Sequence, residues 1–218
     1  MMARPLSAYD RALLDLQRDI LRMGDLVRGF LAKSLEALKR QDIVLAKQVI
    51  EGDAQIDELD YSIEEKALDL IALQQPAPGD LRILATVMRV GKELERIGDY
   101  AVNIAETAER LAGKGPYFKP LVDIPCMSEL AQIMLHKALK ALVQGDIKLA
   151  REVIDADDQV DRLFEDLYEE LVGFMKKGPE YVDQASYLAL VARYLERIAD
   201  HAVNIGEMVI FRETGVRP

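Results

Sequence analysis

Tryptophan is absent from this 218-residue chain, and cysteine occurs once, at Cys126. A single cysteine excludes an intramolecular disulfide and every metal motif built from several cysteines, so we expect a protein of the reducing cytoplasm. No apolar run approaches the roughly 20 residues that a membrane-spanning helix needs. The opening residues, Met1 to Pro5, are not followed by the apolar core of a secretory signal.

Basic residues are in the minority: 28 lysines and arginines face 38 aspartates and glutamates, which gives a formal net charge of −10. A protein that binds the phosphate backbone of nucleic acids needs a basic stripe, and attraction to anionic lipid needs clustered positive charge. The composition therefore argues against nucleic-acid binding and against direct lipid binding. It favours cations and basic protein surfaces as partners.

Aromatic residues are scarce at 6%, whereas half of the chain is hydrophobic, a composition typical of long packed helices. Apolar residues recur at intervals of three and four and predict helices, which prolines and glycines then end. No segment has the alternation of a strand. The expected helices are six in number: from a cap at Ser7 to about residue 37, from Asp42 to about Gln75, 83–111, 124–144, from Asp146 to Gly178, and from Pro179 to about Arg212.

An internal repeat organises the chain. The segment 94–106 returns as 195–207 with ten of its thirteen residues identical, and Asp42, Asp53 and Asp57 return as Asp146, Asp157 and Asp161. Such self-similarity predicts one helical unit used twice. We therefore expect an all-α protein of two tandem, pseudo-symmetric, antiparallel three-helix bundles, with domains at 1–113 and 124–218 and a linker at 114–123.

Acidic residues recur within the repeat. On a helical wheel, the carboxylates of the third helix fall within an arc of about 40° on nearly the opposite side from the apolar seam, and so point outward. Hard or borderline cations accept such oxygen ligands, which predicts metal binding by iron, zinc, manganese or magnesium. The candidate ligands are Glu95, Asp99, Glu106, Glu196, Asp200, Glu207, Asp53, Asp57, Asp157 and Asp161.

Small residues recur every seven positions between the apolar seam and the acidic arc. They let the backbone of a neighbouring helix approach closely. In the first copy they are Gly91, Gly98 and Ala105, and in the second Ala192, Ala199 and Gly206.

A simpler interpretation stays open for the acidic arc. Carboxylates opposite a core seam usually form a solvated face, paired here with Arg96, Arg110 or Arg197. Among the other polar residues, we expect Asn103 and Asn204 to bond to neighbouring backbone, His201 to have a surface or interhelix role, and His136 to be structural.

Catalysis has no support in the sequence. A carboxylate-bridged di-iron site would need Glu-x-x-His pairs, and neither His136 nor His201 has a glutamate three residues earlier. Nucleotide-binding glycine loops, the G-x-S-x-G elbow and H-E-x-x-H are absent as well. We expect a protein without enzymatic activity.

The two copies of L-E-R-I-[GA]-D-x-A-V-N-I-[AG]-E resemble the signature of the PhoU family, as does Asp80-Leu81-Arg82 after Gln74-Gln75-Pro76. The resemblance covers nearly the whole chain. It implies two three-helix bundles and metal clusters at Glu95/Asp99 and Glu196/Asp200. The second half departs from the pattern, because it has no clear equivalent of the Gln-Gln-Pro and Asp-Leu-Arg segments near Gly178.

The resemblance also implies a function. It would make the protein a cytoplasmic negative regulator that links the ATPase subunit of a phosphate ABC transporter to a sensor histidine kinase when phosphate is plentiful. A homodimer would be usual. Two other hypotheses stay open: a metal-buffering or metal-sensing bundle, and a purely structural helical adaptor.

Overall fold

Seven helical segments form the protein in the computed structural model, which describes residues 8–216 and 218; the expected cap at Ser7 lies outside them. No strand occurs among these residues. The segments are α1 (Ala8–Arg40), α2 (Ile43–Gly52), α3 (Ala54–Gln74), α4 (Pro78–Leu111), α5 (Asp123–Gln144), α6 (Ile147–Met175) and α7 (Pro179–Thr214).

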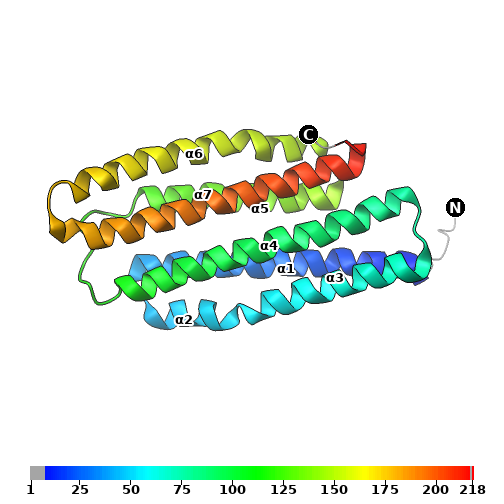
Figure 1. Ribbon diagram of the computed structural model, residues 1–218, viewed down its shortest axis with the longest axis horizontal. Helices are drawn as coiled ribbons and strands as arrows, with labels where there is room; N and C mark the ends of the chain where they lie inside the picture. The colour runs from blue at the N-terminus through cyan, green and yellow to red at the C-terminus, as the bar shows by residue number, and fades with distance from the viewer. Residues whose placement is uncertain (1–7, 217) are drawn as a thin grey trace.

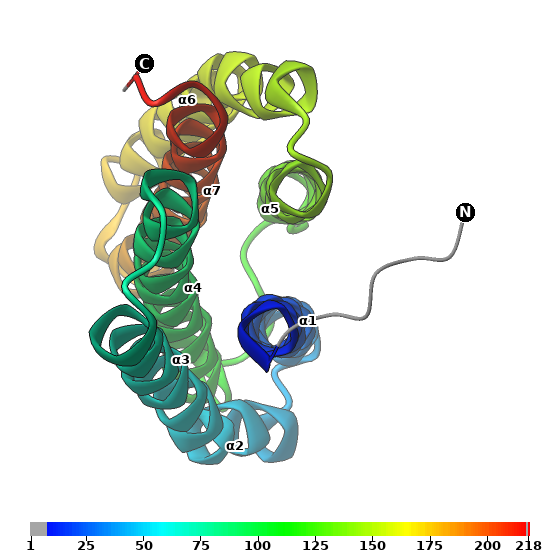
Figure 2. The same cartoon turned by 90° about the vertical axis from the view of Figure 1, so that its right-hand side faces the viewer.

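The segments assemble into the expected two three-helix bundles. The first contains α1, α4 and the pair α2 and α3, and the second contains α5, α6 and α7 (Figure 1). Viewed end-on, α4 and α7 lie together on one side, whereas α1 and α5 lie together on the other (Figure 2). The division at 114–123 stays a prediction, because α4 and α7 pack against each other across it.

The repeated aspartates cap corresponding helices. Asp42 accepts hydrogen bonds from the backbone of Val44 and Leu45, both at 3.0 Å, and Asp146 accepts one from Leu149 at 3.0 Å. These are N-cap bonds, which satisfy N–H groups that have no partner within the helix. The repeat in the sequence therefore marks the same structural position twice.

The second expected helix is divided at Asp53, where α2 ends and α3 begins. Gly52 is buried there, and a Cβ on it would lie only 2.4 Å from the ring of Phe30 on α1. This approach is open only to a residue without a side chain. In the second half α6 runs unbroken through the corresponding position.

The helices α4 and α7 run antiparallel through the centre of the molecule (Figure 1). Tyr100 on α4 lies against Tyr194 on α7, with ring centroids 5.8 Å apart, and against His201, at 5.7 Å. Both copies of the repeated motif therefore lie side by side in this contact. Their buried apolar residues complete the cores of the two bundles.

No helix among the described residues is long and apolar enough to cross a membrane. The apolar residues instead cover one another, and the longest helices bury most of their apolar seams. The fully buried members on α4 include Val90, Leu94, Ile97, Ala101 and Ile104.

Replacing Ile104 by alanine should lower the free energy of unfolding by about 2–5 kcal/mol, because the lost side chain leaves a cavity in a close-packed core. Ile104 is fully buried, whereas Leu73 on α3 is 75% exposed and provides the control. Urea denaturation of both variants measures the difference. An Ile104→Ala variant as stable as Leu73→Ala would contradict the assignment of Ile104 to the core.

Candidate functional site

The first acidic cluster joins α3 to α4 and contains Asp53, Asp57, Glu95 and Asp99. Asp53 and Asp57 lie one turn apart at the start of α3, and Glu95 and Asp99 lie one turn apart in the middle of α4. Burial raises the pKa of Asp53 to about 6, helped by the negative charges of Asp57, Asp99 and Glu95. Four carboxylates from two helices therefore share one environment.

Asp53 is positioned to face α4 instead of capping its own helix. It precedes α3 directly, yet its side chain makes no cap hydrogen bond. Its Oδ1 lies 3.8 Å from the point that a Cβ on Gly98 would occupy, and that point is 2.8 Å from Ile56 Cδ1. Gly98 thus lets this turn of α3 come close to α4, as the pattern of small residues predicts.

The second cluster repeats the arrangement between α6 and α7. It contains Asp157, Asp161, Glu196 and Asp200. Burial, followed by the charges of Asp161, Asp200 and Glu196, raises the pKa of Asp157 to about 6. The two halves therefore place equivalent carboxylates against equivalent helices.

The prediction that these carboxylates point outward is wrong for the two glutamates. The side chains of Glu95 and Glu196 are only 14% and 11% exposed. The wheel divides a helix into one buried and one solvated face, but α4 and α7 each have neighbours on several sides. Each acidic arc consequently lies against the adjoining helix of its own bundle.

Basic residues one turn away partly neutralise both clusters. In the first, Lys92 donates to Glu95 at 2.7 Å and Arg96 donates to Asp99 at 3.1 Å. In the second, Arg193 donates to Glu196 at 2.5 Å and Arg197 donates to Asp200 at 2.7 Å. The interpretation of the acidic arc as a set of local ion pairs therefore has direct structural support.

Three carboxylate oxygens in the clusters are nevertheless buried without a hydrogen bond: Glu95 Oε2, Glu196 Oε2 and Asp157 Oδ1. Arg96 Nε and Arg197 Nε lie 3.6 Å from the two glutamate oxygens, beyond a normal hydrogen bond. An ionised carboxylate can only accept, so a cation or a donor would satisfy these atoms.

The chemistry of the clusters suits a metal ion, but the present positions of their side chains do not. All the donors are carboxylate oxygens, which suit hard cations, and three of them lack a partner. As the side chains lie, however, no three acidic, histidine or cysteine residues in the described part of the chain converge to hold an ion. Binding would require Arg96, Arg197 and their neighbours to release the carboxylates.

Glu106 and Glu207 are not brought into the clusters. Each lies seven residues beyond Asp99 or Asp200, or about 10 Å along the helix axis. Glu106 is paired with Arg110 instead, at 3.5 Å. These two glutamates therefore recur because the helix is repeated, but they do not lie beside the other acidic residues.

One polar contact between the bundles was missed from the sequence. Glu93 Oε2 on α4 lies 2.6 Å from His201 Nδ1 and accepts a hydrogen bond from Asn204 Nδ2 at 2.9 Å, both on α7. Burial by itself would raise the pKa of Glu93, but the bonds to His201 and Asn204 lower it on balance. The interhelix role of His201 is confirmed; the backbone role expected for Asn204 is wrong.

Aligning the two copies of the motif shows a sequence difference that relates to this contact. Glu93 lies just before the first copy, and the residue at its position in the second half is Tyr194, which packs on Tyr100. Near its middle the contact between α4 and α7 thus combines polar and aromatic side chains, and His201 touches both Glu93 and Tyr100. Comparing the differing positions of the two copies, instead of the identical ones, would have pointed to it.

Comparison with known proteins gives matches to both halves of the chain. A model of the PhoU domain matches residues 20–108 and 124–209, so each match includes one acidic cluster. The chain belongs to the PhoU domain family. PhoU family structures share its fold: PhoU from Pseudomonas aeruginosa is 34% identical with a TM-score of 0.92, covering 95% of this chain and 100% of that one.

Other members of the PhoU family match over similar lengths. The phosphate transport system regulatory protein PhoU from Streptococcus pneumoniae is 29% identical, with a TM-score of 0.89 over 96% of this chain and 99% of that one. A phosphate-specific transport system accessory protein PhoU homologue from Aquifex aeolicus is 40% identical, covering 86% of this chain and 84% of its own. A homologue from Methanothermobacter thermautotrophicus is 34% identical and covers 98% of both.

The raised pKa values of Asp53 and Asp157 predict a pH dependence of stability. Between about pH 4 and pH 6 the folded protein binds more protons at these residues than the unfolded chain, so their contribution to the free energy of unfolding falls as pH rises through this interval. In the absence of metal, an Asp53→Asn/Asp157→Asn variant should lose less stability than wild type from pH 4 to pH 7.

Urea denaturation across this pH range measures the effect. The exposed Asp69 and Asp166, on α3 and α6, provide a matched control when both are changed to asparagine. Parallel pH profiles for wild type and the Asp53→Asn/Asp157→Asn variant would show that the clustered carboxylates ionise freely in the folded protein.

Proposed function

We propose that this protein is a non-enzymatic regulator of phosphate uptake and of phosphate-starvation signalling. It couples the ATPase subunit of a phosphate ABC transporter to a sensor histidine kinase on the cytoplasmic side, and it does so as a homodimer. The single observation that carries the proposal is the match to relatives named as phosphate transport accessory proteins, which extends over both bundles at 33–40% identity.

The acidic clusters provide the second element of the proposal, namely metal ions. Asp53, Asp57, Glu95 and Asp99 would hold one site, and the second would use Asp157, Asp161, Glu196 and Asp200. A bound iron, zinc, manganese or magnesium ion would supply positive charge between carboxylates that otherwise repel one another. Support comes from the buried carboxylate oxygens that lack a hydrogen bond.

The residues of this chain would act by linking helices. The acidic residues of α3 and α6 face those of α4 and α7, so shared ligands would fasten each outer helix to its central one. Lys92, Arg96, Arg193 and Arg197 hold the same carboxylates when no ion is bound. These four pairs each lie within one helix, although Lys92 also approaches Asp60 on α3 at 3.7 Å, so metal binding would add links between helices.

Metal analysis tests this element. Wild-type protein, incubated with iron, zinc, manganese or magnesium and then dialysed, should retain metal, and a Glu95→Ala/Asp99→Ala/Glu196→Ala/Asp200→Ala variant should retain at least tenfold less. Glu106→Ala/Glu207→Ala is the matched control, because these residues lie on the same helices outside the clusters. Equal, negligible metal in all three proteins would eliminate the metal sites.

Regulation needs a separate experiment. In a bacterium lacking its own PhoU, this chain should restore repression of a phosphate-starvation promoter in phosphate-rich medium, and it should copurify from membranes with the transporter ATPase subunit or the kinase. Promoter activity and affinity purification are the measurements. Metal retention without repression would favour the metal-buffering bundle, and unchanged regulation by the quadruple alanine variant would assign regulation to the helical scaffold alone.

A further inference from the structure

The helices α1 and α5 lie on the side of the molecule opposite the α4–α7 contact (Figure 2). A groove lies between these two helices. The two helices meet where Gly24 packs on Leu139; a Cβ on Gly24 would lie 2.6 Å from Leu139 Cδ1. Beyond this point, between the second half of α1 and the first part of α5, the groove has a volume of about 500 Å³. It shares no residue with either acidic cluster.

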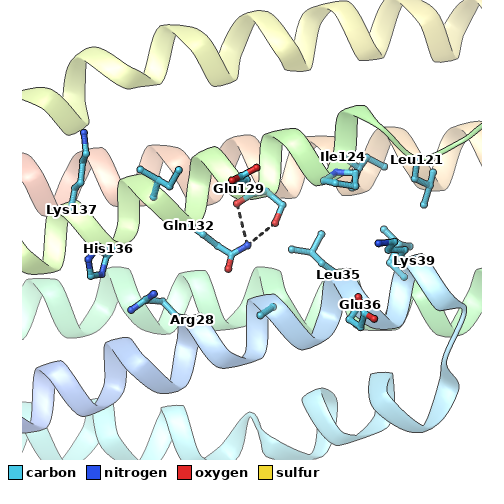
Figure 3. A pocket seen from close by; sticks show the side chains of 15 residues that line it. Arg28, Leu35, Glu36, Lys39, Leu121, Ile124, Glu129, Gln132, His136 and Lys137 are labelled. Atoms are coloured by element: carbon cyan, nitrogen blue, oxygen red, sulfur yellow. Dashed lines mark hydrogen bonds between the residues drawn. The ribbon is translucent and has the colours of Figure 1, made fainter.

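Apolar side chains make up much of the groove between its ends. Leu35 on α1 and Ile124 on α5 project into it (Figure 3), and Ile133 on α5 is 45% exposed at its wall. One polar side chain, Gln132, lies among them and donates a hydrogen bond to Ser128 Oγ at 2.9 Å (Figure 3). Along α1 the lining runs from Arg28 to Lys39, which is about 16 Å or three helical turns. The dimensions suit the apolar stripe of one short helix.

The ends of the groove carry basic residues. At one end Arg28 and His136 face each other from opposite walls with Lys137 nearby, and at the other end lies Lys39 (Figure 3). Lys39 makes no ion pair within the described part of the chain. Arg28 pairs with Asp25 at 3.6 Å, yet its Nε is buried without a hydrogen bond, and Lys137 pairs with Glu152 at 3.2 Å. The acidic lining residues are Glu36, which is paired with Arg40, and Glu129.

This charge pattern is opposite to that of the molecule as a whole, whose net charge is −10. A groove with mostly apolar walls, whose basic residues outnumber its acidic ones, complements a ligand that is apolar along one stripe and negative at its ends. The acidic remainder of the surface disfavours anionic lipid, and a concave slot between two helix walls suits a third helix.

We propose that the α1–α5 groove binds an amphipathic helix of a partner protein, about three turns long and bearing carboxylates at both ends of its apolar stripe. Apolar side chains at i, i+3 or i+4, and i+7 occupy the space between Leu35 and Ile124. Carboxylates meet Arg28 and His136 at one end and Lys39 at the other. This proposal rests on the proposed function in one respect: a regulator must bind a partner protein.

Peptide binding tests the proposal without any phosphate-dependent readout, so its failure is distinct from failure of the regulatory function. The probes are fluorescent, hydrocarbon-stapled 14-residue helices with leucines in the i, i+3/i+4, i+7 registers, flanked by glutamates or, in matched copies, by lysines. Fluorescence polarisation with purified full-length protein gives the dissociation constants. Glutamate-flanked helices should bind wild type at least tenfold more tightly than their lysine-flanked copies.

Charge reversal supplies the decisive comparison. Lys39→Glu/Lys137→Glu should bind glutamate-flanked helices at least tenfold more weakly than wild type and should prefer lysine-flanked ones, which also shows that the variant is folded. Lys33→Glu/Lys148→Glu makes the same change in net charge at exposed positions outside the groove and should bind as wild type does. Ile133→Glu should weaken binding tenfold, unlike Leu190→Glu, a similarly exposed position on α7.

Several outcomes would overturn the proposal. One is that no glutamate-flanked helix binds, and another is that the Lys39→Glu/Lys137→Glu and control variants bind alike. Binding of wild type to phosphatidylglycerol vesicles but to none of the helices would assign the groove to a membrane. Dissociation of an oligomer by Ile133→Glu, without peptide binding by wild type, would assign it to a second copy of this chain.

Discussion

The antiparallel contact between α4 and α7 is the constraint on which the rest of the molecule depends. Each of these helices completes the core of its own bundle and also packs against the other bundle, so the two halves cannot be positioned independently. The repeated motif lies at this contact in both copies. Its apolar residues serve two interfaces at once, and its first two carboxylates in each copy lie beside the aspartates of α3 or α6.

In the clusters, carboxylates are partly buried close to one another, although burial and mutual repulsion both disfavour their charged forms. Partial burial of Asp53 and Asp157 among other carboxylates raises the pKa of each to about 6, and the nearby basic side chains take up one oxygen of each glutamate while the other is left without a hydrogen bond. The proposed metal ions would satisfy the atoms that ion pairing leaves without a hydrogen bond. Exposed surface carboxylates have no such requirement, since water solvates them.

Much of the architecture could be predicted from the sequence, because helical periodicity and the caps at Asp42 and Asp146 are local signals. The repeat also associated Asp53 and Asp57 with Glu95 and Asp99, but it wrongly grouped Glu106 with them. Periodicity on one helix could not show that Glu95 is enclosed by α3, nor that Glu106 is remote from the cluster, since both depend on how neighbouring helices cross. The contact of Glu93 with His201 was missed because it joins segments 108 residues apart.

The interruption at Asp53 makes the two halves structurally unequal. α2 and α3 are separate helices that meet at one turn, and Asp53 lies at this junction. Asp157 instead lies within the continuous 29-residue α6. The geometry of the first cluster therefore depends on how two shorter helices each pack against α4, whereas that of the second depends on the placement of a single helix.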